Sequence, residues 1–408
     1  MVFPLIFSGY SHIPREAKEA VVDATDYGVA TDNSGEDNSK ALQALIDELS
    51  DGGGTVYIPK GEYKFAENGS QTIGSHCVKM RSNVSIVGDG DTTVLKPTGH
   101  SSYGLDMFYF NEYLDTEKAV YLENCRFESF VIDATDTSCD VYTSAGKGFM
   151  FNLFKNCHWT GVTVKYTDAT GFGVDCPVDS TISSCIAIGC GKAATEGSSG
   201  ASGFGIGFGY SENESIFIKD CQAVENKKFG FFFEHQGRFD SDKYSAEPVG
   251  LFSVTDCRAS GNLFGFGGLY ATNTKYEGCA SSNSGKYGFL FENSTASEAT
   301  DCVSLNEGEA SFAVLRSNFD FKWNEGEIIL TRCEGNGSPI GAKIIGDVRD
   351  NTLMDSRIES CKFINTQCAV YTCGNMKGLT LTKNASDTSQ NDLSAKVGYM
   401  INSDNSWN

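Results

Sequence analysis

Three carboxylates occupy the same place in a repeated phrase of this 408-residue sequence: Asp175, Glu234 and Glu292. Each is the fourth residue after the Gly that opens a short Gly-Phe phrase, as in GFGVD and GFFFE. Two carboxyl groups held at a fixed spacing can act as the acid and the base of glycoside hydrolysis. We therefore take these three residues as the candidate catalytic groups.

The repeated phrase has the pattern of a half-buried strand. The first and third residues after its opening residue are nearly always apolar, and the second and fourth vary, which is the two-residue period of a β-strand. We expect the apolar pair to face an interior and the acids to face outward. The phrases are GFMFN from Gly148, GFGVD from Gly171, GFGIG from Gly203, GFFFE from Gly230, GFGGL from Gly265, GFLFE from Gly288 and SFAVL from Ser311.

If these strands stack, the acids form one outward column. Asp175 and Glu234 would be two rungs apart, or roughly 9.6 Å along the stack, with Gly207 between them. Inverting glycosidases hold their two carboxyl groups about 6.5–9.5 Å apart. Glu292 would repeat this separation beyond Glu234, and Asn152 would occupy the same column as a substrate-binding residue. The chain has 53 acidic residues, so an acidic surface without a site remains the alternative.

A second repeat places cysteines at regular intervals. Nine of the fifteen follow a polar pair, as in ENC, KNC and TDC, at separations of 22–36 residues. Such a period is typical of a solenoid. Fifteen is an odd number, and we expect these cysteines to stack as buried free thiols. They are Cys125, Cys157, Cys185, Cys221, Cys257, Cys279, Cys302, Cys333 and Cys361.

The N-terminal part carries a resemblance. It runs D-Y-G-V, a polar stretch, an amphipathic helix expected at about 38–50 with Asn38 or Ser39 as its cap, then G-G-G-T-V-Y-I-P and G-E-Y. This order closely resembles the entry module of the pectate-lyase-like superfamily of right-handed parallel β-helices. The resemblance implies an all-β fold, a single-stranded right-handed parallel β-helix of about ten coils with an N-terminal helix-and-strand cap. The superfamily includes polygalacturonase-like hydrolases, alginate C5-epimerases, lyases and phage tail depolymerases, so it does not select the chemistry.

We divide the chain into a cap over residues 1–65, a β-helix over 66–375, and a C-terminal strand and tail over 376–408. The opening residues lack the basic segment of a signal peptide. The localisation therefore stays open between the cytoplasm, a virion, and secretion with the signal already removed. The net charge of −21 disfavours nucleic acid and anionic membranes as partners, and no apolar run is long enough for membrane insertion.

One strand allows the epimerase resemblance to be tested. The segment GFGVDCP resembles the Gly-Tyr-Gly-Phe-Asp-Pro-His strand of alginate C5-epimerases, and Asp175 falls on its Asp. Phe172 and Pro177 replace the Tyr and the His of that strand. Two coils later, where those epimerases have an Arg followed by a second His, this chain has Lys228 and Phe229. Lys228 keeps the positive charge of the Arg, and Phe229 removes the His. Epimerases and lyases need an acid and a base at the sugar C5, so these replacements favour hydrolysis.

Two insertions next to the acids could form the sides of a binding groove, residues 191–202 and 236–249. The second contains Arg238 and Lys243 as candidate substrate-binding residues. His235, directly after Glu234, is a candidate for substrate binding or for a structural role. Tyr210 and Tyr270 are the tyrosines that a lyase or epimerase would use with Lys228.

The sequence thus predicts a carbohydrate-active enzyme, a glycoside hydrolase that cleaves a polysaccharide or oligosaccharide in a groove on the outer face of the solenoid. A polysaccharide lyase or C5-epimerase is the first alternative. A phage tail-spike or receptor-binding module without turnover is the second. We expect no cofactor and no metal, because the five His are scattered and C-x-x-C is absent. The expected assembly is a monomer or a homotrimer.

Overall fold

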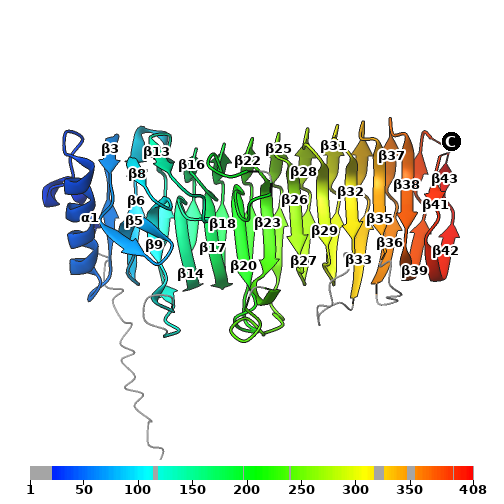
Figure 1. The fold of residues 1–408 in the computed structure, drawn as a ribbon, viewed down its shortest axis with the longest axis horizontal. Coiled ribbons are helices and arrows are strands. Elements are labelled where there is room, and N and C mark those ends of the chain that lie inside the picture. Colours follow the sequence, from blue (N-terminus) through cyan, green and yellow to red (C-terminus); the bar gives the residue numbers. More distant parts are fainter. Residues whose placement is uncertain are drawn as a thin grey trace, which may run out of the picture.

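The computed structural model describes residues 21–113, 118–195, 197–238, 240–316, 326–346, 354–388 and 390–407. Within these residues three long sheets of 14, 14 and 13 strands run side by side along one axis. The strands of neighbouring coils pair in parallel, and Figure 1 shows them stacked as a straight rod. The expected parallel β-helix is confirmed, and it has more rungs than the ten coils that we expected.

The first sheet has 14 strands, which pair in the following order. They are β1 (Val21–Asp23), β2 (Gly54–Tyr57), β6 (Val84–Val87), β11 (Arg126–Glu128), β15 (His158–Thr160), β18 (Ser180–Ser183), β21 (Ile216–Lys219), β24 (Phe252–Thr255), β27 (Thr274–Glu277), β30 (Ser297–Thr300), β33 (Gly326–Thr331), β36 (Met354–Glu359), β39 (Asn375–Thr382) and β42 (Lys396–Ser403).

The second sheet carries the candidate acids and is called the site sheet below. Its strands are β4 (Gly69–Gln71), β5 (Gly74–Lys79), β9 (Leu105–Phe110), β14 (Phe149–Lys155), β17 (Phe172–Val178), β20 (Phe204–Phe208), β23 (Phe229–His235), β26 (Phe264–Leu269), β29 (Tyr287–Glu292), β32 (Ala310–Leu315), β35 (Ile340–Ile345), β38 (Cys368–Cys373) and β41 (Asp392–Leu393), with β10 (Leu122–Glu123) beside β14. Strands β4 and β5 form an antiparallel hairpin at its start.

The third sheet consists of short strands. They are β3 (Gly61–Phe65), β7 (Thr93–Pro97), β12 (Val131–Asp133), β16 (Thr163–Lys165), β19 (Ile186–Ile188), β22 (Gln222–Val224), β25 (Arg258–Ser260), β28 (Ala280–Ser282), β31 (Val303–Leu305), β34 (Glu334–Asn336), β37 (Lys362–Ile364), β40 (Ala385–Ser386) and β43 (Ser406–Trp407). Outside the three sheets lie the strand pair β8 (Gly99–Ser101) and β13 (Thr137–Cys139), and the single-turn 3₁₀ helices Ala24–Tyr27, Gly90–Thr92 and Gln236–Arg238.

Helix α1 (Gly35–Leu49) closes the N-terminal end of the rod (Figure 1). Its cap is Ser34, whose hydroxyl accepts a hydrogen bond from the Asp37 amide, so the predicted caps Asn38 and Ser39 are wrong. Both lie inside the helix with their side chains buried. Asn38 donates to the Lys64 carbonyl, and Ser39 donates to the Ala66 carbonyl. These two polar residues therefore fasten the helix to the strands instead of starting it.

The interior is built from the apolar positions of the repeated phrase. The first and third residues of the phrases, Phe231 and Phe233 among them, are buried as predicted. One ring per rung stacks on the next, with centroid separations of 4.7–5.1 Å from Phe172 through Phe312. This aromatic column explains why Phe recurs at the same position, because stacked rings fill the coil at the spacing of the strands.

The nine repeated cysteines also form a column. All are buried and unpaired, as the sequence predicts. The Cys221 Sγ accepts a hydrogen bond from the amide of Cys185, and the Cys257 Sγ accepts one from the amide of Cys221. Each thiol therefore lies over the start of the neighbouring coil, where a small apolar side chain with weak polar character fits the corner.

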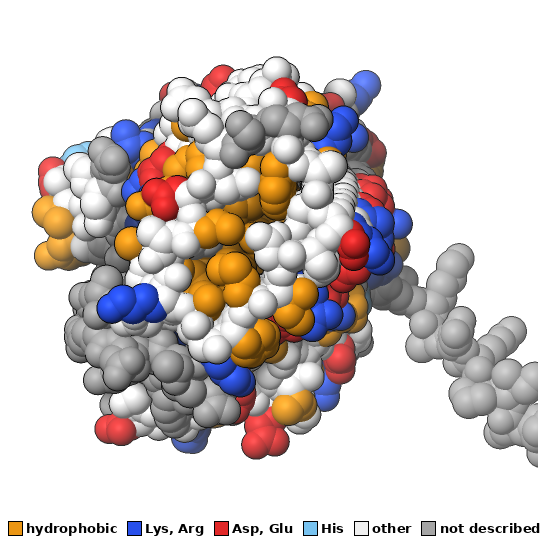
Figure 2. All heavy atoms as spheres, turned by 90° about the vertical axis from the view of Figure 1, so that its right-hand side faces the viewer, with side chains coloured by type: hydrophobic (Ala, Val, Ile, Leu, Met, Phe, Trp, Pro, Cys, Tyr) orange, Lys and Arg blue, Asp and Glu red, His pale blue; other side chains and the backbone are white. Residues whose placement is uncertain are grey.

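The strands after residue 375 continue the three sheets to the C-terminal end of the rod. Figure 2 shows that hydrophobic side chains gather in the middle of this end face. Leu393, Val397 and Trp407 pack there against the core, and Tyr399 and Ile401 are about half exposed. The boundaries of the three proposed parts of the chain stay a proposal. Within the described residues the structure contains no helix with the length and apolarity that crossing a membrane requires.

Candidate functional site

The strand register places the acids in one outward column. Asp175 of β17 pairs with Gly207 of β20, which pairs with Glu234 of β23. Glu234 then pairs with Leu269 of β26, and Leu269 pairs with Glu292 of β29. The three carboxylates are half-buried and occupy alternate rungs. The predicted column is therefore confirmed, two rungs separating each acid from the next.

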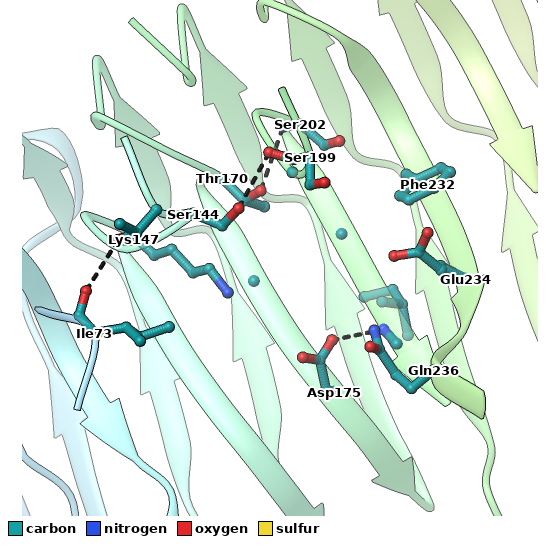
Figure 3. A pocket seen from close by; sticks show the side chains of 16 residues that line it. Ile73, Ser144, Lys147, Thr170, Asp175, Ser199, Ser202, Phe232, Glu234 and Gln236 are labelled. Atoms are coloured by element: carbon teal, nitrogen blue, oxygen red, sulfur yellow. Dashed lines mark hydrogen bonds between the residues drawn. The ribbon is translucent and has the colours of Figure 1, made fainter. Parts of the chain in front are cut away.

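Asp175 and Glu234 border the same pocket, which has a volume of about 480 Å³. Strands β17, β20 and β23 form its floor, and residues 143–147 and 199–202 with Gln236 form its sides. Figure 3 shows the two carboxylates extending toward the same space from opposite sides of the floor. The two inserted loops thus contribute residues to the pocket, as their positions in the sequence predict.

The environment of Asp175 favours a proton donor. Its Oδ1 accepts a hydrogen bond of 2.7 Å from the Gly207 amide. Burial raises the pKa of Asp175, and the Lys147 charge and the Gly207 amide oppose this rise only in part. A carboxyl group whose pKa is raised keeps its proton to higher pH and can donate it during a reaction.

Lys147 is a functional candidate that the sequence reasoning missed. It precedes the Gly-Phe phrase of β14, and its side chain lies across Gly173 of the next rung, where an added Cβ would meet the lysine methylenes. Figure 3 shows Lys147 reaching into the pocket. Asp106 fixes the lysine backbone by accepting hydrogen bonds of 2.8 and 2.7 Å from the amides of Gly146 and Lys147. The pocket therefore combines two carboxylates with one cation.

Glycines keep the floor of the pocket open. Gly205 and Gly207 lie on the outer face of β20 between the two acids. A Cβ at Gly207 would lie 2.5 Å from the Asp175 Oδ1, so a larger residue would displace the carboxylate. The missing side chains give a ligand access to the backbone.

Hydrogen bonds and ring contacts within the protein hold the loop that follows β23. His235 is 1 % exposed, and its ring nitrogens are hydrogen-bonded to the Ala246 carbonyl and the Gly237 amide at 3.0 Å. Of the two roles predicted for His235, the structure thus supports the structural one. Asn152 is buried and donates to the Tyr244 hydroxyl, while its Oδ1 has no partner among the described residues. Lys243 lies 3.6 Å from the centre of the Tyr113 ring. Asn152 thus contacts the loop through Tyr244, and Lys243, a residue of the loop, contacts Tyr113.

The remaining candidates lie apart from the Asp175 pocket. Glu292 and Lys228 line a second cavity beside it, of about 140 Å³, which shares Glu234 with the first. Tyr210 packs edge-on against the Tyr113 and Tyr244 rings, and Tyr270 is buried. Neither tyrosine lines either of these two cavities. The side chain of Arg238 lies outside the described part of the structure.

The comparisons with known proteins agree with this architecture. Residues 21–237, more than half of the chain, match the family described as rhamnogalacturonase A/epimerase, pectate lyase-like. The chain belongs to this family. The resemblance of the entry module to the pectate-lyase-like superfamily is thereby confirmed.

Two Azotobacter vinelandii mannuronan C5-epimerases are similar to this pectate-lyase-like chain. AlgE1 is 40% identical over 79 residues, which are 19% of this chain and 5% of AlgE1. The A-module of AlgE6 has a TM-score of 0.67 at 17% identity, covering 95% of this chain and 99% of that module. The exopolygalacturonase of Thermotoga maritima has a TM-score of 0.58 at 12% identity, covering 85% of this chain and 87% of the enzyme. At these identities the structural matches show the shared fold.

Proposed function

We propose that this pectate-lyase-like chain is an enzyme that acts on a polysaccharide lying across the site sheet, and that it hydrolyses a glycosidic bond. The observation that carries the proposal is the pair of Asp175 and Glu234, which face one pocket from two rungs apart with Gly207 between them. Two rungs correspond to roughly 9.6 Å along the rod. This is close to the spacing of about 6.5–9.5 Å that leaves room for a water beside the sugar in inverting hydrolysis.

The two carboxylates have different roles in this proposal. Burial raises the pKa of Asp175, so Asp175 serves as the acid that protonates the leaving oxygen of the glycosidic bond. Glu234 serves as the base that takes a proton from the attacking water on the other side of the sugar ring. Lys147 beside Asp175 suits an anionic group on the substrate, such as the carboxylate of a uronic acid.

Epimerisation or β-elimination of a uronan is the second candidate. The similarity to mannuronan C5-epimerases favours it, as does Lys147, which could neutralise a uronate carboxylate before the C5 proton is removed. None of the described residues that line the Asp175 pocket is a histidine. In both reactions Glu234 would be the base that removes the C5 proton. Asp175 would be the acid, which returns a proton to the opposite face of C5 in epimerisation and protonates the leaving glycosidic oxygen in elimination.

One assay separates these reactions. A panel of neutral and anionic polysaccharides is incubated with the protein and scored for new reducing ends, for the ultraviolet absorbance of unsaturated uronates, and for C5 configuration by NMR. Hydrolysis gives reducing ends alone, elimination gives both reducing ends and absorbance, and epimerisation changes only the configuration. Binding without any of the three products would support the tail-spike or receptor-binding alternative and contradict the proposed enzyme.

The variants Asp175→Asn and Glu234→Gln test the residues. Each keeps the side-chain shape and removes a proton donor or acceptor, so turnover should fall by about 10²–10⁴-fold with the fold intact. Circular dichroism and thermal unfolding of both variants provide the control. Wild-type turnover in both variants would contradict the assigned roles.

A further inference from the structure

The two ends of the rod differ in how they are closed. Helix α1 lies across the N-terminal end, where Asn38 and Ser39 fasten it to the Lys64 and Ala66 carbonyls. At the other end no described helix or strand covers the last coil, which consists of β41, β42 and β43. Hydrophobic side chains are therefore visible in the middle of this end face (Figure 2).

The most exposed of these apolar side chains belong to one strand. Tyr399, Met400 and Ile401 of β42 are 48%, 39% and 49% exposed. Leu393 of β41 and Trp407 of β43 are only partly buried where they pack against the core. Apolar groups that gather on one exposed face are expected where a protein partner covers them.

The backbone of β42 is open on the same side. The strand has eight residues, pairs with β39 along one edge, and is the last strand of the first sheet within the described residues. Its other edge therefore presents a row of backbone N–H and C=O groups, to which a further strand can bind. The partner that fits this end best is one that supplies a strand.

The sequence of β42 is complementary to a second copy of itself. In an antiparallel pair centred on Met400, Lys396 of each strand lies opposite Asp404 of the other, because both residues are equally distant from Met400. Both side chains are exposed. The same register brings Tyr399 opposite Ile401, and both kinds of pair stabilise antiparallel strands. A register shifted by one residue loses both charge pairs.

We propose that two copies of the protein associate through the C-terminal ends of their rods, with β42 of one copy paired antiparallel to β42 of the other about a two-fold axis at Met400. The first sheets of the two copies would then be continuous, and the apolar residues of both end faces would be covered. Helix α1 at the far end of each copy prevents the contact from repeating, so the assembly closes as a dimer instead of growing into a filament.

This inference is independent of the proposed reaction, because the contact lies several rungs beyond the strands that form the Asp175 pocket. Sedimentation velocity of the full chain tests it at 0.15 M salt, where exposed charges more than about 8 Å apart are screened. We expect the sedimenting mass to rise with concentration from 44.0 kDa to twice that value. Ile401→Asp, which places a charge in the covered face, should stay monomeric where the wild type is a dimer.

Exchange of the two charges tests the register. Lys396→Glu alone and Asp404→Lys alone each place like charges opposite one another twice, once on each side of the axis. Each should therefore raise the dissociation constant of the dimer about tenfold. The double variant Lys396→Glu/Asp404→Lys restores opposite charges and should dimerise nearly as well as the wild type. Lys64→Glu makes the same charge change at an exposed position of β3, near the other end, and should have no effect.

Thermal unfolding of each variant controls for its fold. A wild type that is monomeric at every concentration would leave the end face to a different partner and overturn the inference, as would an assembly larger than a dimer. A dimer that persists in Ile401→Asp would show that the copies meet through another surface. A double variant that dimerises no better than the single ones would overturn the pairing of Lys396 with Asp404.

Discussion

Replacing Gly207 by alanine tests the geometry of the proposed acid with a single methyl group. The added Cβ would lie 2.5 Å from the Asp175 Oδ1 and 2.8 Å from its Cγ, far inside ordinary contact distance, and the flexible end of Gln236, still nearer, would have to turn aside. The carboxylate must therefore move by about 1 Å and lose the 2.7 Å hydrogen bond from the Gly207 amide. A hydrogen bond to a charged group contributes about 1.5–3 kcal/mol, so kcat should fall by about 10- to 100-fold.

Stability should change little in the same variant. Gly207 does not have a positive φ, so alanine can adopt its backbone conformation, and the methyl group points into the pocket. The assay is kcat on the polymer that the wild type turns over, with thermal unfolding measured in parallel. Gly205→Ala is the matched comparison on the same face of β20, because its nearest contact is the Thr170 methyl at 3.1 Å. If Gly207→Ala keeps wild-type kcat, or loses no more than Gly205→Ala, Asp175 is not the acid.

Three further predictions concern the charge, the core and the thiols. Lys147→Met removes the cation that lowers the pKa of Asp175, so this pKa should rise further. The alkaline limb of the kcat/KM profile should then move to higher pH, and a shift to lower pH would contradict the role of Lys147. Phe231→Ala should lower the free energy of unfolding by about 3–5 kcal/mol, and Phe232→Ala by much less. Urea unfolding measures both, and the reverse order would show that the assignment of inward and outward positions is wrong. The column cysteines should react with a thiol reagent without prior reduction only once the protein unfolds, so a native titration that matches the denatured one would contradict their burial.

The fold could be predicted because its signals repeat along the sequence. Each rung of the site sheet shows the same alternation of apolar and variable residues, so an ambiguous phrase can be assigned by comparison with its neighbours. The stacking of Phe231 on Phe204 and Phe266 follows from that alternation alone. Ser34 was not found as the helix cap because Asn38 and Ser39 are equally common capping residues. Their actual partners, the Lys64 and Ala66 carbonyls, are set by tertiary packing.

Site residues could be predicted only where they occupy a repeated position of the strands. The acids share one position of the phrase, so their column appears in the sequence. Lys147 comes from the residue before the phrase, and its place depends on Gly173, 26 positions later, which leaves room for it. The position of His235 in the sequence is misleading. It directly follows the candidate base Glu234, but its ring is hydrogen-bonded to the backbone of the loop and takes no part in the pocket. Contacts that loops make across coils have no period, and only the structure shows them.

Stacking also makes the separation of the two carboxylates a discrete quantity. Acids on one column of the site sheet can only be a whole number of rungs apart, in steps of about 4.8 Å, so no small shift of the backbone can bring Asp175 and Glu234 closer. The remaining adjustment is side-chain length, and one acid is an Asp while the other is a Glu, longer by one methylene. A chain of this kind could change its reaction geometry by an Asp-to-Glu exchange, or by moving an acid one coil along the rod, without altering the rest of the solenoid.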